Sequence, residues 1–185
     1  MGDADGDFGL GAVICTAEVD CDALLEGVAR HLHARGHDVA AYVHRHASDD
    51  DACCDSIAVE EIFSGLRWLI TQSLGSGSQA CRLDPHGLAD VAAHAMEALD
   101  RGPDLVILNR FGKSEAEGQG MRDVLARGCA AGIPMLTVLK QEHLGAWDAF
   151  TDGMAQVIPA HPEAVLGWCD RVMAPRGGVR AASQT

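Results

Sequence analysis

The sequence predicts a three-layer α/β fold, in which a mostly parallel β-sheet carries helices on both faces. Short apolar runs alternate with segments of helical spacing along most of the chain. One strand–helix–strand unit is already complete within residues 11–44. Such crossovers place strands in parallel and cover the sheet with helices.

The first elements are two strands and the helix between them. Gly11–Cys15 is an apolar run of the kind found in a buried parallel strand. Apolar residues then recur every fourth position over Leu24–Leu32, which predicts one buried stripe along a helix. Val39–His44 predicts the second strand. The segment Arg45–Ser56, which contains three consecutive aspartates, is expected to be a loop.

An inserted β-hairpin is predicted in the middle of the chain. Ile57–Phe63 and Leu66–Thr71 have the composition of strands, and a Ser-Gly pair separates them. A Gly/Ser loop is expected from Leu74 to Arg82. Asp84-Pro85 then predicts a helix start, because an acid suits the N-cap and proline suits the first helical position. This helix should end near Leu99.

The second half continues the alternation of strands and helices. Asp104–Asn109 is the clearest buried strand of the sequence, and a polar loop, Arg110–Gly120, follows it. A helix over Met121–Ala131 and a strand over Pro134–Leu139 come next. The remaining expected elements are a short helix over Glu142–Phe150, a strand over Ala155–Ile158 and a helix over Glu163–Met173.

Residues 10–173 are expected to form a single domain. A chain of 185 residues suits one domain, and its 48% apolar content is enough for a sizeable core. We expect residues 1–9 to be flexible and residues 174–185 to form a disordered tail.

The charge balance excludes several classes of partner. With 14 basic and 27 acidic residues, the formal net charge is −13. Nucleic acids and anionic membranes are bound mainly through Lys and Arg, so neither is an expected partner. The acidic start of the chain lacks the features of a secretory signal, which favours a cytoplasmic location. Formation of a homo-oligomer is left open.

One strand end gathers groups that could bind an anion. Asn109 and Arg110 close the predicted buried strand, and Gly112 and Lys113 follow at once. Ligands of open α/β sheets bind beyond the carboxyl ends of the strands. Arg110 offers a planar fork of donors, Lys113 adds a second cation, and Gly112 lets the backbone approach a ligand. Equally, both cations could pair with nearby glutamates.

The Gly/Ser loop is a second candidate. Backbone N–H groups around Gly77 could form an anion nest, Ser76 and Ser78 could donate hydroxyl hydrogens, and Arg82 would add charge. An ordinary surface turn before a capped helix explains the same residues.

The loop between the first strand and the first helix is unlike a phosphate loop. Thr16–Asp20 holds neither glycine nor lysine, and its acids would repel a triphosphate. This argues against ordinary ATP or GTP hydrolysis.

Cysteines and histidines offer a metal or redox alternative. Cys53, Cys54 and Cys81 would form a thiol cluster if their loops meet, although the sequence has no Cys-x-x-Cys spacing. Histidines gather between His31 and His46, where a solvated helix end explains the pattern better than a metal site does. Cys15, Cys129 and Cys169 lie in apolar segments and are expected in the core.

The segments Leu74–Asp84 and Asn109–Gly118 resemble those of a bacterial family known only as domain of unknown function 2478. The resemblance extends from Gly11 to about Cys169. Genes of that family often lie near molybdate transport genes, which implies molybdate or tungstate as a ligand.

The layout also resembles P-loop nucleoside triphosphatases with degenerate motifs. Asn109–Lys113 falls on a motif that reads Asp-Glu-Ile-Gly-Lys in one such family, so the acids that handle magnesium and water are replaced by Asn109 and Arg110. The resemblance implies the fold and a bare anion as guest, without hydrolysis.

We therefore expect a non-hydrolysing protein that binds a small oxyanion or a phosphate-bearing ligand. A divergent nucleoside triphosphatase, in which Lys113 replaces the missing lysine and Glu115 or Glu117 holds magnesium, is the first alternative. A thiol-based metal or redox module is the second. The residues expected to bind the ligand are Ser76, Gly77, Ser78, Arg82, Asn109, Arg110, Gly112 and Lys113.

Overall fold

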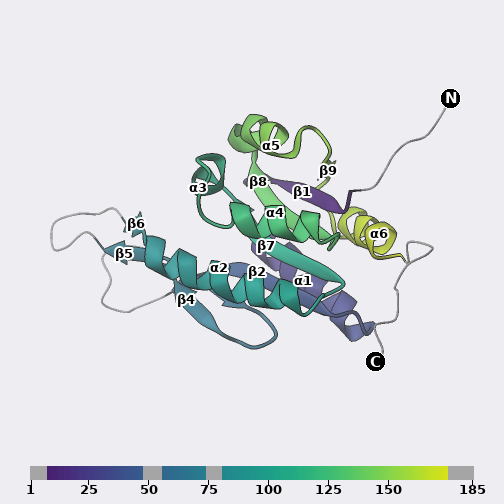
Figure 1. Cartoon of the computed structure of the whole chain (residues 1–185), viewed down its shortest axis with the longest axis horizontal. Helices are drawn as coiled ribbons and strands as arrows, with labels where there is room; N and C mark the ends of the chain where they lie inside the picture. The colour runs from purple at the N-terminus through teal and green to yellow at the C-terminus, as the bar shows by residue number, and fades with distance from the viewer. Residues whose placement is uncertain (1–7, 48–55, 74–80, 175–185) are drawn as a thin grey trace.

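A computed structural model describes residues 8–47, 56–73 and 81–174, and its main sheet has seven strands (Figure 1). The strand order is β4-β3-β2-β7-β8-β1-β9. The five strands from β2 to β9 in this order are mutually parallel, and β3 and β4 extend the sheet in antiparallel pairing. The strands are β1 (Leu10–Cys15), β2 (Val39–Ala47), β3 (Ser56–Glu61), β4 (Arg67–Leu69), β7 (Leu105–Phe111), β8 (Met135–Lys140) and β9 (Gln156–Ile158).

Helices cover both faces of this sheet and complete three layers. Alternate residues of one strand serve the two cores: Val106 and Leu108 of β7 face one cluster, whereas Leu105 and Ile107 face the other. One face carries α1 (Cys21–Ala34) and α6 (Pro162–Met173). The other carries α2 (Pro85–Asp100), α4 (Arg122–Ala130) and α5 (Leu144–Thr151), the last preceded by the short 3₁₀ helix η1 (Gln141–His143).

The helix boundaries follow the signals in the sequence. Asp20 caps α1 by accepting a hydrogen bond from the Ala23 N–H at 3.0 Å, and Asp84 caps α2 through the His86 N–H at 3.0 Å. Gly36 and Gly102, just beyond these helices, take positive φ angles of 90° and 69°. Glycine adopts this conformation without steric cost, so both helices end where glycine allows the chain to turn.

β3 and β4 form the predicted hairpin. This hairpin is part of the main sheet. β3 pairs with both β2 and β4. A further two-stranded ribbon, β5 (Thr71–Ser73) and β6 (Cys81–Leu83), lies beside the start of α2 at one end of the molecule (Figure 1).

Three predicted loops were too long. Arg45, His46 and Ala47 continue β2, because each has a pairing partner in β3. Cys81 and Arg82 belong to β6, which pairs with β5. The loop expected over residues 110–120 begins as strand, since β7 extends to Phe111, and continues as a single helical turn, α3 (Lys113–Ala116).

The segments predicted to be flexible or disordered, residues 1–9 and 174–185, lie almost entirely outside the residues that the structure describes. Residues 1–7 and 175–185 lie outside the described residues, as do 48–55 and 74–80. Within the described ranges, no helix combines the length and apolarity that crossing a membrane requires.

Candidate functional site

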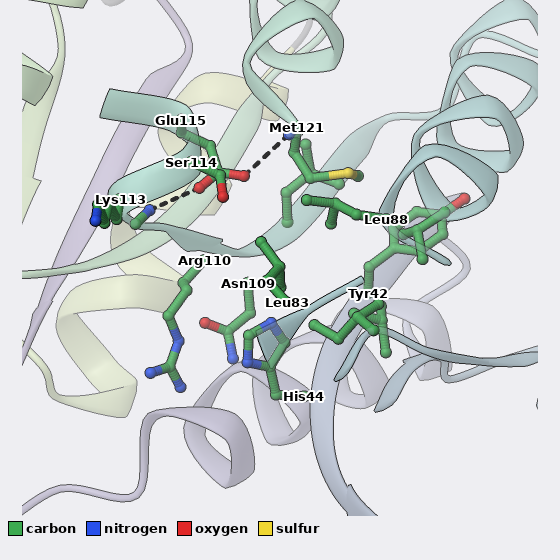
Figure 2. A pocket seen from close by; sticks show the side chains of 15 residues that line it. Tyr42, His44, Leu83, Leu88, Asn109, Arg110, Lys113, Ser114, Glu115 and Met121 are labelled. Carbon is green, nitrogen blue, oxygen red and sulfur yellow. Dashed lines mark hydrogen bonds between the residues drawn. The ribbon is translucent and has the colours of Figure 1, made fainter. Parts of the chain in front are cut away.

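A cavity of about 210 Å³ lies at the carboxyl ends of β2 and β7 (Figure 2). Four of the predicted ligand residues line it: Asn109, Arg110, Gly112 and Lys113. In a parallel sheet all strands end at the same edge, which is why this edge collects the polar residues that follow buried strands. Ser76, Gly77 and Ser78 lie outside the described residues, and only the backbone of Arg82, in β6, is described. The role of these four in ligand binding stays a prediction.

A β-bulge sets the direction of Asn109 and Arg110. Leu108 pairs with Thr137 and Phe111 pairs with Leu139, so β7 has one more residue than β8 between these pairs. The Thr137 hydroxyl donates a hydrogen bond to the Leu108 carbonyl at 2.6 Å. The extra residue keeps Leu108 and Phe111 in the same core and directs the two intervening side chains toward α1.

Asp22, in the first turn of α1, meets both of these side chains. Its carboxylate accepts hydrogen bonds from the Asn109 side-chain amide and, at 3.0 Å, from the His44 backbone N–H. The second carboxylate oxygen lies 3.6 Å from Nη2 of Arg110. Burial raises the pKa of Asp22, against the lowering effects of these N–H donors and of Arg110.

Two polar atoms of the lining residues Asn109 and Arg110 are buried without a partner among the described residues. Arg110 Nε and Asn109 Oδ1 form no hydrogen bond with any residue that the structure describes. Such groups are uncommon in folded proteins, because a buried donor or acceptor without a partner costs free energy. They make this part of the structure a candidate ligand site.

His44 adds a neutral imidazole to the same wall. Burial, and after it the charge of Arg110, lowers the pKa of His44 to about 4. The ring therefore offers one donor nitrogen and one acceptor nitrogen near neutral pH. The sequence assigns His44 to the end of the second strand and to a histidine cluster, and neither assignment predicts this position on the cavity wall. Within the described ranges, no group of three or more His, Cys, Asp or Glu residues could hold a metal ion.

Lys113 and Arg110 differ in how they face the cavity. The Lys113 side chain is 82% exposed, and its ammonium lies 3.8 Å from the Glu117 carboxylate. Arg110 is 33% exposed on its side chain and is paired with Asp22. Figure 2 shows both cationic side chains extending away from Tyr42 and Leu88, which form the far wall.

Glu115 stabilises the backbone at the rim of the cavity. This residue is 5% exposed, and its carboxylate accepts hydrogen bonds from the backbone N–H groups of Gly112, at 2.9 Å, and Met121, at 3.0 Å (Figure 2). The two bonds tie the ends of the α3 segment together. The segment therefore presents Gly112 and Lys113 at a fixed position.

The thiol cluster falls largely outside the described chain. Cys53 and Cys54 lie outside the described residues, and only the backbone of Cys81 is described. Of the cysteines expected in the core, Cys169 is fully buried, whereas Cys15 and Cys129 are half-buried.

Sequence reasoning missed Asp22 and the apolar side of the cavity. Asp22 follows the N-cap residue of the first helix, and the parallel topology brings that helix start to the same edge as the end of β7. That topological rule was the one signal that could have found it. The apolar lining residues Tyr42, Leu83 and Leu88 come from three separate elements, and only the fold unites them.

Comparisons with known proteins agree with the fold and the family. A family model described as "Protein of unknown function (DUF2478)" matches residues 10–168. A protein named molybdenum import ATP-binding protein ModC 2, from Bradyrhizobium diazoefficiens, is 34% identical over 157 residues. These residues make up 85% of this chain and 18% of that protein, so the chain spans less than a fifth of its relative. The solution structure of a human cancer-related nucleoside triphosphatase matches with a TM-score of 0.59 and 14% identity, over 88% of this chain and 94% of that one. This likeness confirms the P-loop-like layout of the fold.

Proposed function

Since the chain belongs to the DUF2478 family, whose name assigns no activity, we propose a function from the site itself: a non-hydrolysing, P-loop-like protein that binds a small oxyanion or a phosphate-bearing ligand. The ligand lies at the carboxyl ends of β2 and β7, with Arg110 as its main cation. Molybdate and tungstate are the first guests to test, because the similar Bradyrhizobium protein is named for molybdenum import.

The buried Arg110 Nε is the observation that carries this proposal. In the described part of the chain this N–H donor has no acceptor, and an oxyanion oxygen would supply one. Charge-assisted hydrogen bonds of this kind are worth about 1.5–3 kcal/mol each. A hydrogen-bearing oxygen of the same ligand would also satisfy Asn109 Oδ1.

The start of α1 supports binding without hydrolysis. In P-loop enzymes a glycine-rich loop and a lysine hold the phosphates at this place. Here Asp20 caps the helix, and Asp22 places a second carboxylate in its first turn. Two carboxylates at this position oppose a triphosphate, because like charges repel at close range.

The contacts of α3 do not favour the alternative of a divergent nucleoside triphosphatase. Glu115 would have to give up two backbone hydrogen bonds to hold magnesium. Lys113 is paired with Glu117 and faces solvent. Neither residue is poised for phosphate transfer.

The test is isothermal titration calorimetry with molybdate, tungstate, sulfate and phosphate. We expect saturable binding of at least one anion by the wild type and its loss in Arg110→Met. The matched control is Arg127→Met, which removes a surface arginine that is also paired with an aspartate, Asp100. This control should bind like the wild type.

Two results would overturn the proposal. One is the absence of binding heat for all four anions, together with an unchanged melting temperature. The other is release of phosphate from Mg-ATP or Mg-GTP that disappears in Glu115→Gln or Glu117→Gln, since this would establish the hydrolytic alternative.

A further inference from the structure

The apolar side of the cavity narrows the class of ligand. Resting on the proposed function, we propose that the physiological ligand is an organic oxyanion: its anionic group lies at Arg110, and a ring-sized apolar body lies between Tyr42, Leu88 and Met121. A bare inorganic ion would fill only the polar end of this cavity.

Beyond Asn109 the walls are almost entirely apolar. Tyr42 contributes its ring rather than its hydroxyl, because the hydroxyl is 2.9 Å from Nδ1 of His94 and points away from Asn109 (Figure 2). Leu83 is 38% exposed and also lines the cavity. The other apolar lining residues are Val59, Ile70, Leu88, Val91, Leu108 and Met121.

The volume of the cavity suits one ring. It measures about 210 Å³. An engineered apolar cavity of about 150 Å³ binds benzene, so the space here has room for one ring. Filling such a space also recovers dispersion contacts that an empty cavity lacks.

A second cavity leaves room for a longer body. It measures about 330 Å³ and lies between the start of α2 and the loop after α3. Leu83, Leu88 and Ser114 line both cavities, so they form the boundary between the two. Most of its remaining lining is apolar or small, with Pro85, Ala89 and Ala92 among these residues.

The polar residues of the cavity account for binding an anion, but they do not account for the apolar walls beside them. Among the polar lining residues, Arg110 Nε and Asn109 Oδ1 have no hydrogen-bond partner in the part of the chain that the structure describes. The apolar walls begin directly beside them, at Leu108 and Tyr42. A ligand that satisfies both parts must carry an oxyanion and an apolar group on one small framework.

Calorimetry with three simple probes tests this inference. Phenyl phosphate carries both parts, inorganic phosphate carries only the anion, and phenol carries only the ring. We expect phenyl phosphate to bind at least about tenfold more tightly than either of the others, a difference of about 1.4 kcal/mol.

Two leucine variants test whether the apolar walls of the cavity cause the tighter binding of phenyl phosphate. Leu83→Gln should remove most of the advantage of phenyl phosphate over phosphate, because it makes a shared wall of both cavities polar. Leu66→Gln alters a leucine that is 48% exposed, lies in the turn between β3 and β4 and lines neither cavity. It should leave the advantage unchanged.

The outcomes separate this inference from the proposed function. Equal affinity for phosphate and phenyl phosphate overturns the organic ligand and leaves oxyanion binding in place. Phenol that binds as tightly as phenyl phosphate also overturns the organic oxyanion, because the anionic group then adds nothing, and the titrations with the four inorganic anions decide the proposed function. If neither phosphate compound binds while molybdate does, the organic ligand is again overturned and the proposed function stands.

Discussion

The carboxylate of Asp22 accepts a hydrogen bond from the side-chain amide of Asn109, although 87 positions separate the two residues in the chain. The same carboxylate lies 3.6 Å from the Arg110 guanidinium. An acid from α1 thus partly neutralises the cation that β7 brings to the cavity. Any anion that binds at Arg110 Nε would share the guanidinium charge with Asp22, and we expect this competition to weaken its binding.

Removing the competing charge should strengthen anion binding. We expect Asp22→Asn to raise the affinity for sulfate by about threefold to tenfold, because a charge pair near a protein surface at such a distance is worth on the order of 1 kcal/mol. Calorimetry with sulfate measures the change. Asp100→Asn, which frees the surface residue Arg127 instead, should leave the affinity unchanged. Weaker binding in Asp22→Asn would contradict the competition.

The same competition predicts a pH dependence. Burial raises the pKa of Asp22, so its carboxylate takes up a proton at a higher pH than an ordinary aspartate does. Sulfate does not titrate in this range, and its affinity should therefore increase as the pH falls through the raised pKa. The increase should be smaller in Asp22→Asn, in which protonation of His44, whose pKa is about 4, is the remaining source of added positive charge. An equal increase in both proteins would show that another group is responsible.

His44 should make the fold less stable in acid. Burial, followed by the neighbouring Arg110, lowers the pKa of His44 from 6.5 to about 4. Between these two values the unfolded chain binds a proton at this residue and the folded chain does not, so the free energy of unfolding falls as the pH falls. The loss should approach about 3 kcal/mol at the acid end of this range.

Urea denaturation at about pH 7 and about pH 4.5 checks this sign. His44→Gln should lose less stability on acidification than the wild type. His31→Gln alters an exposed histidine of α1 and should behave like the wild type. If His44→Gln and the wild type lose the same stability, the neutral imidazole is excluded.

Glu115 should matter for stability. Glu115→Ala leaves the N–H groups of Gly112 and Met121 without their acceptor, and we expect a loss of about 2–3 kcal/mol in the free energy of unfolding. Glu117→Ala removes an exposed glutamate from the same turn and should cost less than about 1 kcal/mol. Similar losses in the two variants would contradict the role given to Glu115.

Two glycine substitutions should have opposite signs. A Cβ atom on Gly11 would lie 2.7 Å from ring atom Cζ2 of Trp168 and 2.7 Å from Cδ1 of Ile158, so Gly11→Ala should destabilise the fold by about 1–3 kcal/mol. Gly27, within α1, has no atom within 4 Å of such a Cβ, and Gly27→Ala should stabilise by about 0.5–1 kcal/mol. Urea denaturation of both proteins measures the contrast. A neutral Gly11→Ala would show that α6 does not pack tightly on β1.

The elements of the fold were predictable because their signals are local. The run Gly11–Cys15 and the capping residues Asp20 and Asp84 act through neighbours in the sequence, and the structure places strands and helices there. The edges of β2 and β6 were not predictable in this way. Arg45 and Arg82 are polar, and only pairing with another strand makes them extended.

The site was predictable in part for the same reason. Asn109, Arg110, Gly112 and Lys113 follow a buried strand, and they do line a cavity at its end. The directions of the Asn109 and Arg110 side chains depend on the bulge in β7 and on Asp22, and the sequence around residue 109 predicts neither. The apolar walls also escaped notice, because apolar residues that line a cavity have the same sequence pattern as those of a filled core.

The most direct measurement is a sulfate or molybdate titration followed at the Nε–H resonance of Arg110 by nuclear magnetic resonance, with Arg110→Met to assign the signal. The account predicts that this resonance shifts in a saturable way as the anion accepts a hydrogen bond from Nε, with smaller changes at the exposed Arg127. A resonance that stays in place while the anion binds elsewhere, or while nothing binds, would contradict it.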